Sequence, residues 1–306
     1  MDWKAEIEAA KARVAPYVRE TPVITTQSFG LSHAITMKLE HMQHTGTFKA
    51  RGAFNTLLST DVPDGGVVAA SGGNHGAAVA HAAKALGHDA HIFVPELAGP
   101  AKIDLICRTG AELTVVPGEY ANALAAAQAH EAKTGAMQIH AYDAPGTVAG
   151  QGTMMAEWEA QGLDADTVLI AVGGGGLIGG ALGWLQGRRK VVGVEPRHCC
   201  ALHKALEYGA PCDVPVSGVA ANALGARRIG EICFGLAQAH LGASVLVDDD
   251  AITAAQVALW REWRILVEPA GAAALAALMS GAYQPEPGEK VAVLLCGANP
   301  APDPIA

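Results

Sequence analysis

The sequence lacks the features that would assign it to a membrane, secreted or nucleic-acid-binding class. No run of about 18 uncharged apolar residues occurs outside its glycine- and alanine-rich segments, so no membrane-spanning helix is expected. The net charge is −9 and no basic stripe is present, which argues against nucleic acid and anionic membranes as partners. Residues Met1 to Glu6 are charged and amphipathic, unlike a secretory signal.

Paired cysteines are also missing. The six cysteines contain no CxxC spacing, and the vicinal pair Cys199-Cys200 is followed by no second cluster. We therefore expect reduced thiols in a cytoplasmic protein. His41 and His44 are three residues apart, but no third and fourth ligand lies near them in the chain, so no metal site is predicted.

What is present is the composition of a well-packed α/β enzyme: 306 residues, half of them hydrophobic, with 36 glycines. From residue 67 onward, strands and helices alternate, which indicates βαβ units and a parallel sheet. The predicted strands of this region are 67–70, 91–94, 112–116 and 137–140, and the predicted helices are 77–86, 102–109 and 120–133. We assign residues 67–141 to a small domain.

A second alternating series follows residue 150, and a helix over 3–18 with short strands at 23–26 and 35–39 opens the chain. The later strands are predicted at 167–172, 190–195, 244–247 and 290–295, and the later helices at 150–161, 177–186, 198–208, 229–239, 251–265 and 270–279. We assign residues 1–66 and 142–306 to a large domain, with an irregular segment at 211–226. We expect no regulatory domain after Asn299.

The segment from His44 to Ala53 draws attention because it places Lys49 in an apolar, small-residue setting. Lys49 follows the strand at 35–39 and opens a predicted helix over 50–58. A lysine at a helix start usually extends its ammonium into water. Alternatively, it is a partly buried amine with a lowered pKa that can form a Schiff base.

A second feature is the run Gly173-Gly174-Gly175-Gly176 between a buried strand and a helix. Glycines let backbone N–H groups converge at the positive end of a helix, which makes a phosphate cradle. The same run could simply allow tight strand–helix packing. No Lys-Ser/Thr pair follows, so it is not a Walker loop; a dinucleotide frame through Gly174, Gly176 and Gly179 would depend on Glu195 for the ribose.

Two further sites lie at predicted strand ends. The turn Ser71-Gly72-Gly73-Asn74 offers a hydroxyl, an amide and exposed N–H groups suited to a carboxylate, although serine and asparagine are also common helix caps. Cys296 follows the last strand, at the edge where open α/β sheets bind ligands. A lone cysteine is more commonly a core residue.

Together these four sites match the needs of pyridoxal phosphate: an amine, a phosphate cup, a hydrogen-bond donor and a neutral partner for the ring nitrogen. The chain resembles the fold-type II pyridoxal-phosphate enzymes, specifically the serine/threonine dehydratase family. The resemblance implies a tryptophan synthase β-like α/β fold of two parallel-sheet domains, with the active site in the interdomain cleft. The matching segments, in the family's order, are 45–53, 71–75, 149–153, 173–177, 268–271 and 296–299.

For the cofactor, the resemblance implies that Lys49 forms the Schiff base and later acts as the base at Cα. Phe48 would lie against the cofactor ring, Asn74 would bond its 3′ oxygen, and Cys296 would face the ring nitrogen. The phosphate would be held by the N–H groups of Gly173, Gly174, Gly175, Gly176 and Leu177.

For the substrate, the resemblance implies that the carboxylate is bound by Ser71, Gly73, Asn74 and His75, and that Glu268 lines the same pocket. We expect Arg51 to support the turn and to help keep the Lys49 amine deprotonated, without contacting the substrate.

The implied reaction is β-elimination from a β-hydroxy-α-amino acid, with L-threonine or L-serine preferred, to a 2-oxo acid and ammonia. A thiol at the ring nitrogen makes a weak electron sink, which favours prompt loss of a leaving group over transamination. Alternatives within the fold are a hydroxyaspartate or phenylserine dehydratase, a β-replacement enzyme and a racemase. Outside it, the alternatives are a nucleotide-binding oxidoreductase and a non-catalytic binding module.

Departures from the family pattern narrow these expectations. Members that racemise serine carry serine where this chain has Gly72, so racemisation should be weak or absent. Metal-binding members place an acidic residue in the segment that here contains Asn222, a poorer ligand for divalent cations. We expect a homodimer acting on a small amino acid, without isoleucine feedback.

Overall fold

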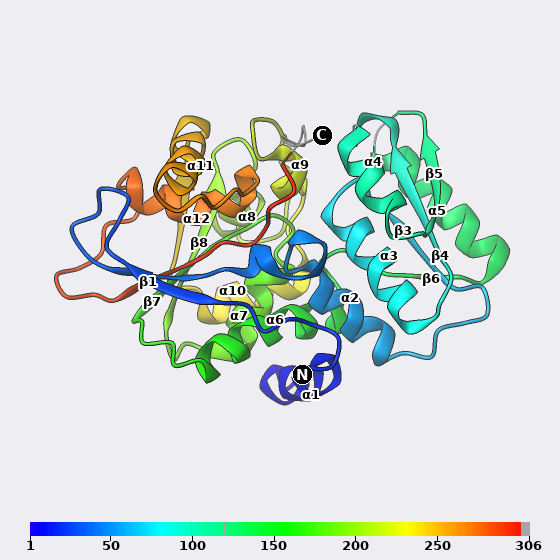
Figure 1. Ribbon diagram of the computed structural model, residues 1–306, viewed down its shortest axis with the longest axis horizontal. Helices are drawn as coiled ribbons and strands as arrows, with labels where there is room; N and C mark the ends of the chain where they lie inside the picture. The colour runs from blue at the N-terminus through cyan, green and yellow to red at the C-terminus, as the bar shows by residue number, and fades with distance from the viewer. Residues whose placement is uncertain (99, 119, 301–306) are drawn as a thin grey trace.

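The computed structural model describes residues 1–98, 100–118 and 120–300, and their strands form two separate sheets (Figure 1). The larger sheet has the strand order β1-β2-β10-β7-β8-β9, and the smaller has the order β5-β4-β3-β6. The strands of the larger sheet are β1 (Val23–Thr26), β2 (Ile35–Lys38), β7 (Thr167–Ala171), β8 (Lys190–Pro196), β9 (Ala243–Val247) and β10 (Val291–Leu294). Those of the smaller sheet are β3 (Val67–Ala70), β4 (Ala90–Pro95), β5 (Glu112–Val116) and β6 (Met137–Gln138).

Among the strands of the described residues, every pair is parallel except β1 with β2, which form an antiparallel hairpin at one edge of the larger sheet. Strands β7 and β10 are buried along their whole lengths, which explains why both segments are almost continuously apolar rather than alternating. The predicted fold class, α/β with two parallel sheets, is confirmed.

Helices cover both faces of the larger sheet (Figure 1). The fully apolar helix α12 packs on β7, β8, β9 and β10, and α7 packs on β7 and β8. In Figure 1, α11 and α12 lie on one side of this sheet and α6, α7 and α10 on the other. The helices are α1 (Trp3–Val14), α6 (Pro145–Ala160), α7 (Gly176–Leu185), α8 (Ala201–Tyr208), α9 (Ala221–Leu224), α10 (Glu231–His240), α11 (Asp249–Trp263) and α12 (Pro269–Met279).

The smaller sheet is sandwiched in the same way. Val67 and Ala69 of β3 belong to the core shared with α3 (Asn74–Leu86) and α4 (Pro100–Cys107). Val68 and Ala70 belong to the core under α5 (Tyr120–Thr134). Successive side chains of a strand point to opposite faces, so β3 supplies both cores at once.

Helix α2 (Lys49–Leu58) lies between the two sheets (Figure 1). Its Ala53, Phe54 and Leu57 share the core of α3, while other residues of α2 pack on α6. The domain boundaries at residues 66 and 142 remain a prediction.

Several predicted element ends were wrong by a few residues. The first helix ends at Val14 rather than residue 18. Pro16 has no backbone N–H to continue the helical hydrogen bonds, although Ala15 before it still has helical dihedrals. Helix α6 begins five residues earlier than predicted, at Pro145, which occupies the first helical position where proline needs no hydrogen bond. The irregular segment contains the short helix α9, and three 3₁₀ helices were not predicted: η1 (Glu40–Met42), η2 (His44–Gly46) and η3 (Glu96–Ala98).

Within the described residues, no helix combines the length and apolarity needed to cross a membrane.

Candidate active site

The Lys49 segment runs alongside the residues that follow β10, and backbone contacts hold the two together. Thr47 forms an antiparallel bridge with Gly297, the Phe48 N–H donates to the Cys296 carbonyl at 3.3 Å, and the Ala298 N–H donates to the Gly46 carbonyl at 2.9 Å. These contacts bring Lys49 beside Cys296, although the two residues are almost the whole chain apart.

The Lys49 amine faces an enclosed environment. Its Nζ donates to the carbonyl oxygen of Ala141 at 2.7 Å and lies 5.3 Å from the centre of the Phe48 ring. Burial lowers the pKa of Lys49 to about 8, and the nearby Cys296 and Glu268 only partly oppose this shift. Lys49 is therefore far easier to deprotonate than a lysine in water.

Cys296 and Glu268 complete this side of the site. Cys296 is 3% exposed, and its thiol donates to the Ala270 carbonyl at 3.4 Å. Burial raises the pKa of the Cys296 thiol, and Glu268 raises it further, so the thiol is neutral near pH 7. A Cβ on Gly297 would come within 2.1 Å of the Glu268 carboxylate, so only glycine allows this approach.

The predicted turn after β3 lies opposite. Asn74 is the first residue of α3, and its side-chain Nδ2 donates to Glu268 Oε1 at 2.6 Å. The N–H of Gly73 is bonded to Ser71 Oγ at 3.2 Å. The first N–H groups of a helix have no partner within the helix, so α3 presents donors here that suit an anion.

The side chain of His75 is bonded within the protein, and the predicted carboxylate contact remains a prediction. Its Nε2 donates to the Ile139 carbonyl at 2.9 Å, and the side chain is buried. Burial, together with the Lys49 charge, lowers the pKa of His75 to about 3, so the ring is neutral. Because its imidazole is buried and bonded to Ile139, only the backbone N–H of His75 is available to bind a carboxylate.

The glycine run forms a tight turn between β7 and α7. Gly175 has a φ of +94°, a left-handed conformation that glycine adopts without strain. A Cβ on Gly174 would lie 2.3 Å from the ring of Tyr142. The bare backbone of this turn leads into the N-terminus of α7, where the N–H groups of Gly176 and Leu177 have no partner within the helix. These features fit a phosphate group.

Sequence reasoning missed the segment after β6. Ala141 supplies the carbonyl that holds Lys49, and the ring of Tyr142 lies against the glycine turn. Asp143 accepts hydrogen bonds from the N–H groups of Glu231 and Ile232, at 3.1 and 3.0 Å, and so ties this segment to α10. The signal that could have found these residues is their place after a parallel strand, at the ligand-binding edge of a sheet.

Two charged residues considered in the sequence lie outside the site. Glu195 is fully buried, and its carboxylate oxygens accept the N–H groups of Leu202 and His203 at 2.8 and 2.7 Å. It therefore caps α8 and is inaccessible to a ribose, which removes the support for a dinucleotide. Arg51 is buried against Glu40 and Glu157, which confirms a structural position. Its charge is not among the causes of the lowered Lys49 pKa, so that part of the expectation is not supported.

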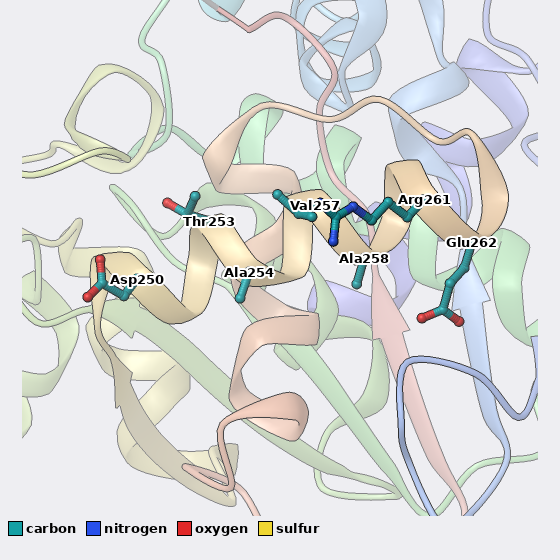
Figure 2. Close-up of a pocket in the computed structure, with 7 residues that line it drawn as sticks. All are labelled: Asp250, Thr253, Ala254, Val257, Ala258, Arg261 and Glu262. Atoms are coloured by element: carbon teal, nitrogen blue, oxygen red, sulfur yellow. The ribbon is translucent and has the colours of Figure 1, made fainter.

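A shallow groove on the outer face of α11 is separate from the site formed around Lys49, Asn74 and Cys296 (Figure 2). It is lined entirely by α11 residues, among them Asp250, Val257 and Arg261, and contains none of the predicted site residues. As for metals, no group of three or more His, Cys, Asp or Glu side chains in the described part of the chain could hold an ion. Asn222 lies on the short helix α9.

Comparison with known proteins places these features in context. Residues 14–297 match the model of a family described as "Pyridoxal-phosphate dependent enzyme". The chain is 35% identical to a phenylserine dehydratase from Ralstonia pickettii, over 96% of this chain and 92% of that protein. It is 34% identical to an L-threonine ammonia-lyase from Geobacter sulfurreducens, over 95% of this chain and 74% of that protein. The structure of maize serine racemase superposes with a TM-score of 0.91 at 29% identity, over 97% of this chain and 93% of that one.

Proposed function

Because the chain belongs to the family of pyridoxal-phosphate dependent enzymes, we propose that it eliminates water from a β-hydroxy-α-amino acid, first of all L-threonine or L-serine. The unsaturated amine left by the loss of water is released and hydrolysed, so the final products are a 2-oxo acid and ammonia. Relatives that act on hydroxy amino acids support this reaction class, among them the L-threonine ammonia-lyase and the phenylserine dehydratase.

Four groups of residues would hold the cofactor. Lys49 Nζ is the amine for its aldehyde, and the Phe48 ring lies beside that amine. Asn74 Nδ2 would donate to the ring oxygen and Cys296 would face the ring nitrogen. The glycine turn from Gly173 to Leu177 would receive the phosphate. When bound, pyridoxal phosphate supplies an electron sink for the carbon that loses its proton.

Lys49 is also the proposed base. An amine with a pKa of about 8 is partly neutral near pH 7, so it can accept the Cα proton without a large energetic cost. The Ala141 carbonyl at 2.7 Å gives the amine a fixed position when it is not reacting.

The substrate carboxylate would lie at the N-terminus of α3. The N–H groups of Asn74 and His75 point out of the first turn, and the Ser71 hydroxyl is adjacent. Because the His75 imidazole is neutral and bonded to Ile139, this site binds through backbone N–H groups and the helix dipole.

The neutral thiol of Cys296 is the observation that carries the proposal. A buried thiol with a raised pKa cannot keep the ring nitrogen protonated as a carboxylate would. Charge left on Cα is then poorly stabilised, which favours prompt departure of the β-hydroxyl over transamination.

Two neighbouring functions have specific support. The 35% identity with a phenylserine dehydratase makes an aryl side chain the second substrate candidate. The likeness to maize serine racemase makes racemisation the second reaction candidate, against which Gly72 argues. Cytoplasmic location and a homodimer remain predictions.

The test begins with the purified holoenzyme, which should be yellow. Borohydride should bleach the colour and leave the cofactor's mass on the peptide that contains Lys49. Assay of 2-oxo acid formation over L-threonine, L-serine, 3-phenylserine and 3-hydroxyaspartate then identifies the substrate. A colourless protein, or a Lys49→Ala variant that eliminates at the wild-type rate, would contradict the proposal.

A further inference from the structure

Asn299 follows β10 and joins two segments of the site that are distant in sequence. Its side-chain Nδ2 donates to the carbonyl of Thr45 at 2.8 Å and to Oδ1 of Asn74 at 2.9 Å. Thr45 precedes Lys49 in the chain, and Asn74 begins α3 beside the smaller sheet. One amide therefore links the Lys49 segment, the end of the larger sheet and the helix of the smaller one.

These contacts fix the direction of the Asn74 amide. Asn299 occupies Oδ1 of Asn74 with a donor, so the Asn74 NH₂ group must point the other way, where it meets the Glu268 carboxylate at 2.6 Å. A flipped Asn74 amide would place donor against donor at Asn299 and oxygen against oxygen at Glu268. Only one orientation satisfies both neighbours.

The backbone around Thr45 is shaped to allow this arrangement. Thr45 adopts a φ of 59°, which is unfavourable for a residue with a β-branched side chain. Gly46 follows with a φ of +75°, and a Cβ there would lie 2.6 Å from Asn299 Oδ1. The left-handed turn thus presents the Thr45 carbonyl to Asn299 and leaves space for its amide.

We infer that Asn299 is a positioning residue that fixes the side-chain NH₂ of Asn74, so that one of its hydrogens bonds Glu268 and the other is directed at the cofactor. The inference rests on the proposed function, in which Asn74 donates to the ring oxygen of pyridoxal phosphate. In this proposal Asn299 affects the cofactor through Asn74, and its bond to Thr45 only holds the amide of Asn299 in place. The effect of Asn299 on cofactor binding should therefore vanish when the Asn74 amide is removed.

The experiment uses Asn299→Asp, which keeps the shape of the side chain and removes its donors. An acceptor facing Oδ1 of Asn74 turns the Asn74 amide, so the dissociation constant for pyridoxal phosphate should rise about tenfold and the visible band of the bound cofactor should shift. Asn122→Asp makes the same chemical change at an exposed position of α5 and should alter neither property.

A double-mutant cycle separates positioning from a general structural role. In an Asn74→Ala background, Asn299→Asp should change neither the dissociation constant nor the band. Circular dichroism of the apoproteins checks folding, and Asn299→Ala, which adds no charge, replaces Asn299→Asp if the latter does not fold.

The outcomes are distinct. If the wild type is yellow and Asn299→Asp leaves the dissociation constant and the visible band unchanged, the positioning role is overturned. The same holds if Asn299→Asp still changes them in the Asn74→Ala background. Both results leave the proposed function intact. A colourless wild type overturns both.

Discussion

At the scale of single residues, the chemistry depends on burial more than on residue type. Lys49 and Cys296 are ordinary residues in the sequence, but burial moves their pKa values in opposite directions. It lowers that of the amine and raises that of the thiol, because in both cases the charged form is the one that loses water. Both groups are therefore held closer to neutrality.

The pKa of Lys49 predicts how the apoprotein captures its cofactor. Only the neutral amine attacks an aldehyde, so the capture rate should rise with pH and level off above about 8. An amine in water would continue to gain reactivity toward a pH of about 10.4. Stopped-flow absorbance of pyridoxal phosphate mixed with apoprotein measures this profile, and a rate still climbing at pH 10 would contradict the burial of Lys49.

Gly72 predicts the choice between elimination and racemisation. A Cβ at this position would lie 2.3 Å from the Cβ of Ala98, so the space that a serine would need is already filled. Wild-type protein should convert L-serine to 2-oxo acid with little D-serine. Gly72→Ser alone should lose about 1–3 kcal/mol of stability through overpacking.

Gly72→Ser combined with Ala98→Gly should recover that stability and raise D-serine formation by roughly 10²-fold, the usual contribution of one acid–base group. Chiral chromatography of the recovered serine provides the measurement. D-serine as the main product of the wild type would show that Gly72 does not prevent racemisation.

At the scale of elements, a buried ionic cluster joins β2, η1, α2 and α6. Lys38 Nζ lies 2.5 Å from Glu157, and Arg51 bridges Glu157 at 2.8 Å and Glu40 at 2.5 Å. Burial alone would raise the pKa of the Glu157 carboxyl, but Arg51 and Lys38 outweigh it and hold the pKa below its usual range. The cluster fixes the start of α2, and hence Lys49, against α6.

Removing one member of this ionic cluster should lower the stability of the folded protein. Glu157→Ala leaves two buried cations without their shared partner, so the free energy of unfolding should fall by about 3–5 kcal/mol. Urea denaturation provides the value. Asp164→Ala, at an exposed ion pair with Lys290, is the matched control and should have a much smaller effect. Equal losses in the two variants would mean that burial of the cluster contributes nothing.

At the scale of the whole molecule, the site exists because two sheets present their strand ends to each other. Asn74 comes from the helix after β3, Cys296 follows β10, and the glycine turn follows β7. Lys49 opens the helix that lies between the sheets (Figure 1). No single βαβ unit contains more than a fraction of these groups.

Much of this could be predicted from the sequence. Periodic apolar residues and glycine turns predicted the alternating strands and helices, because they reflect local geometry. The same turns identified Lys49, Asn74 and the glycine run as candidate site residues. Element ends such as Val14 and Pro145 were less predictable, since they depend on individual proline positions.

The sequence by itself determined the element order and the glycine turns, since these depend on short-range conformational preferences, and it singled out Lys49 as the candidate amine. Only the tertiary structure decided which side chains meet. It buried Glu195 under α8, turned the His75 ring toward Ile139, and placed Asn299 against Asn74. Such contacts join residues far apart in the chain, and only packing of the folded elements brings them within hydrogen-bonding distance.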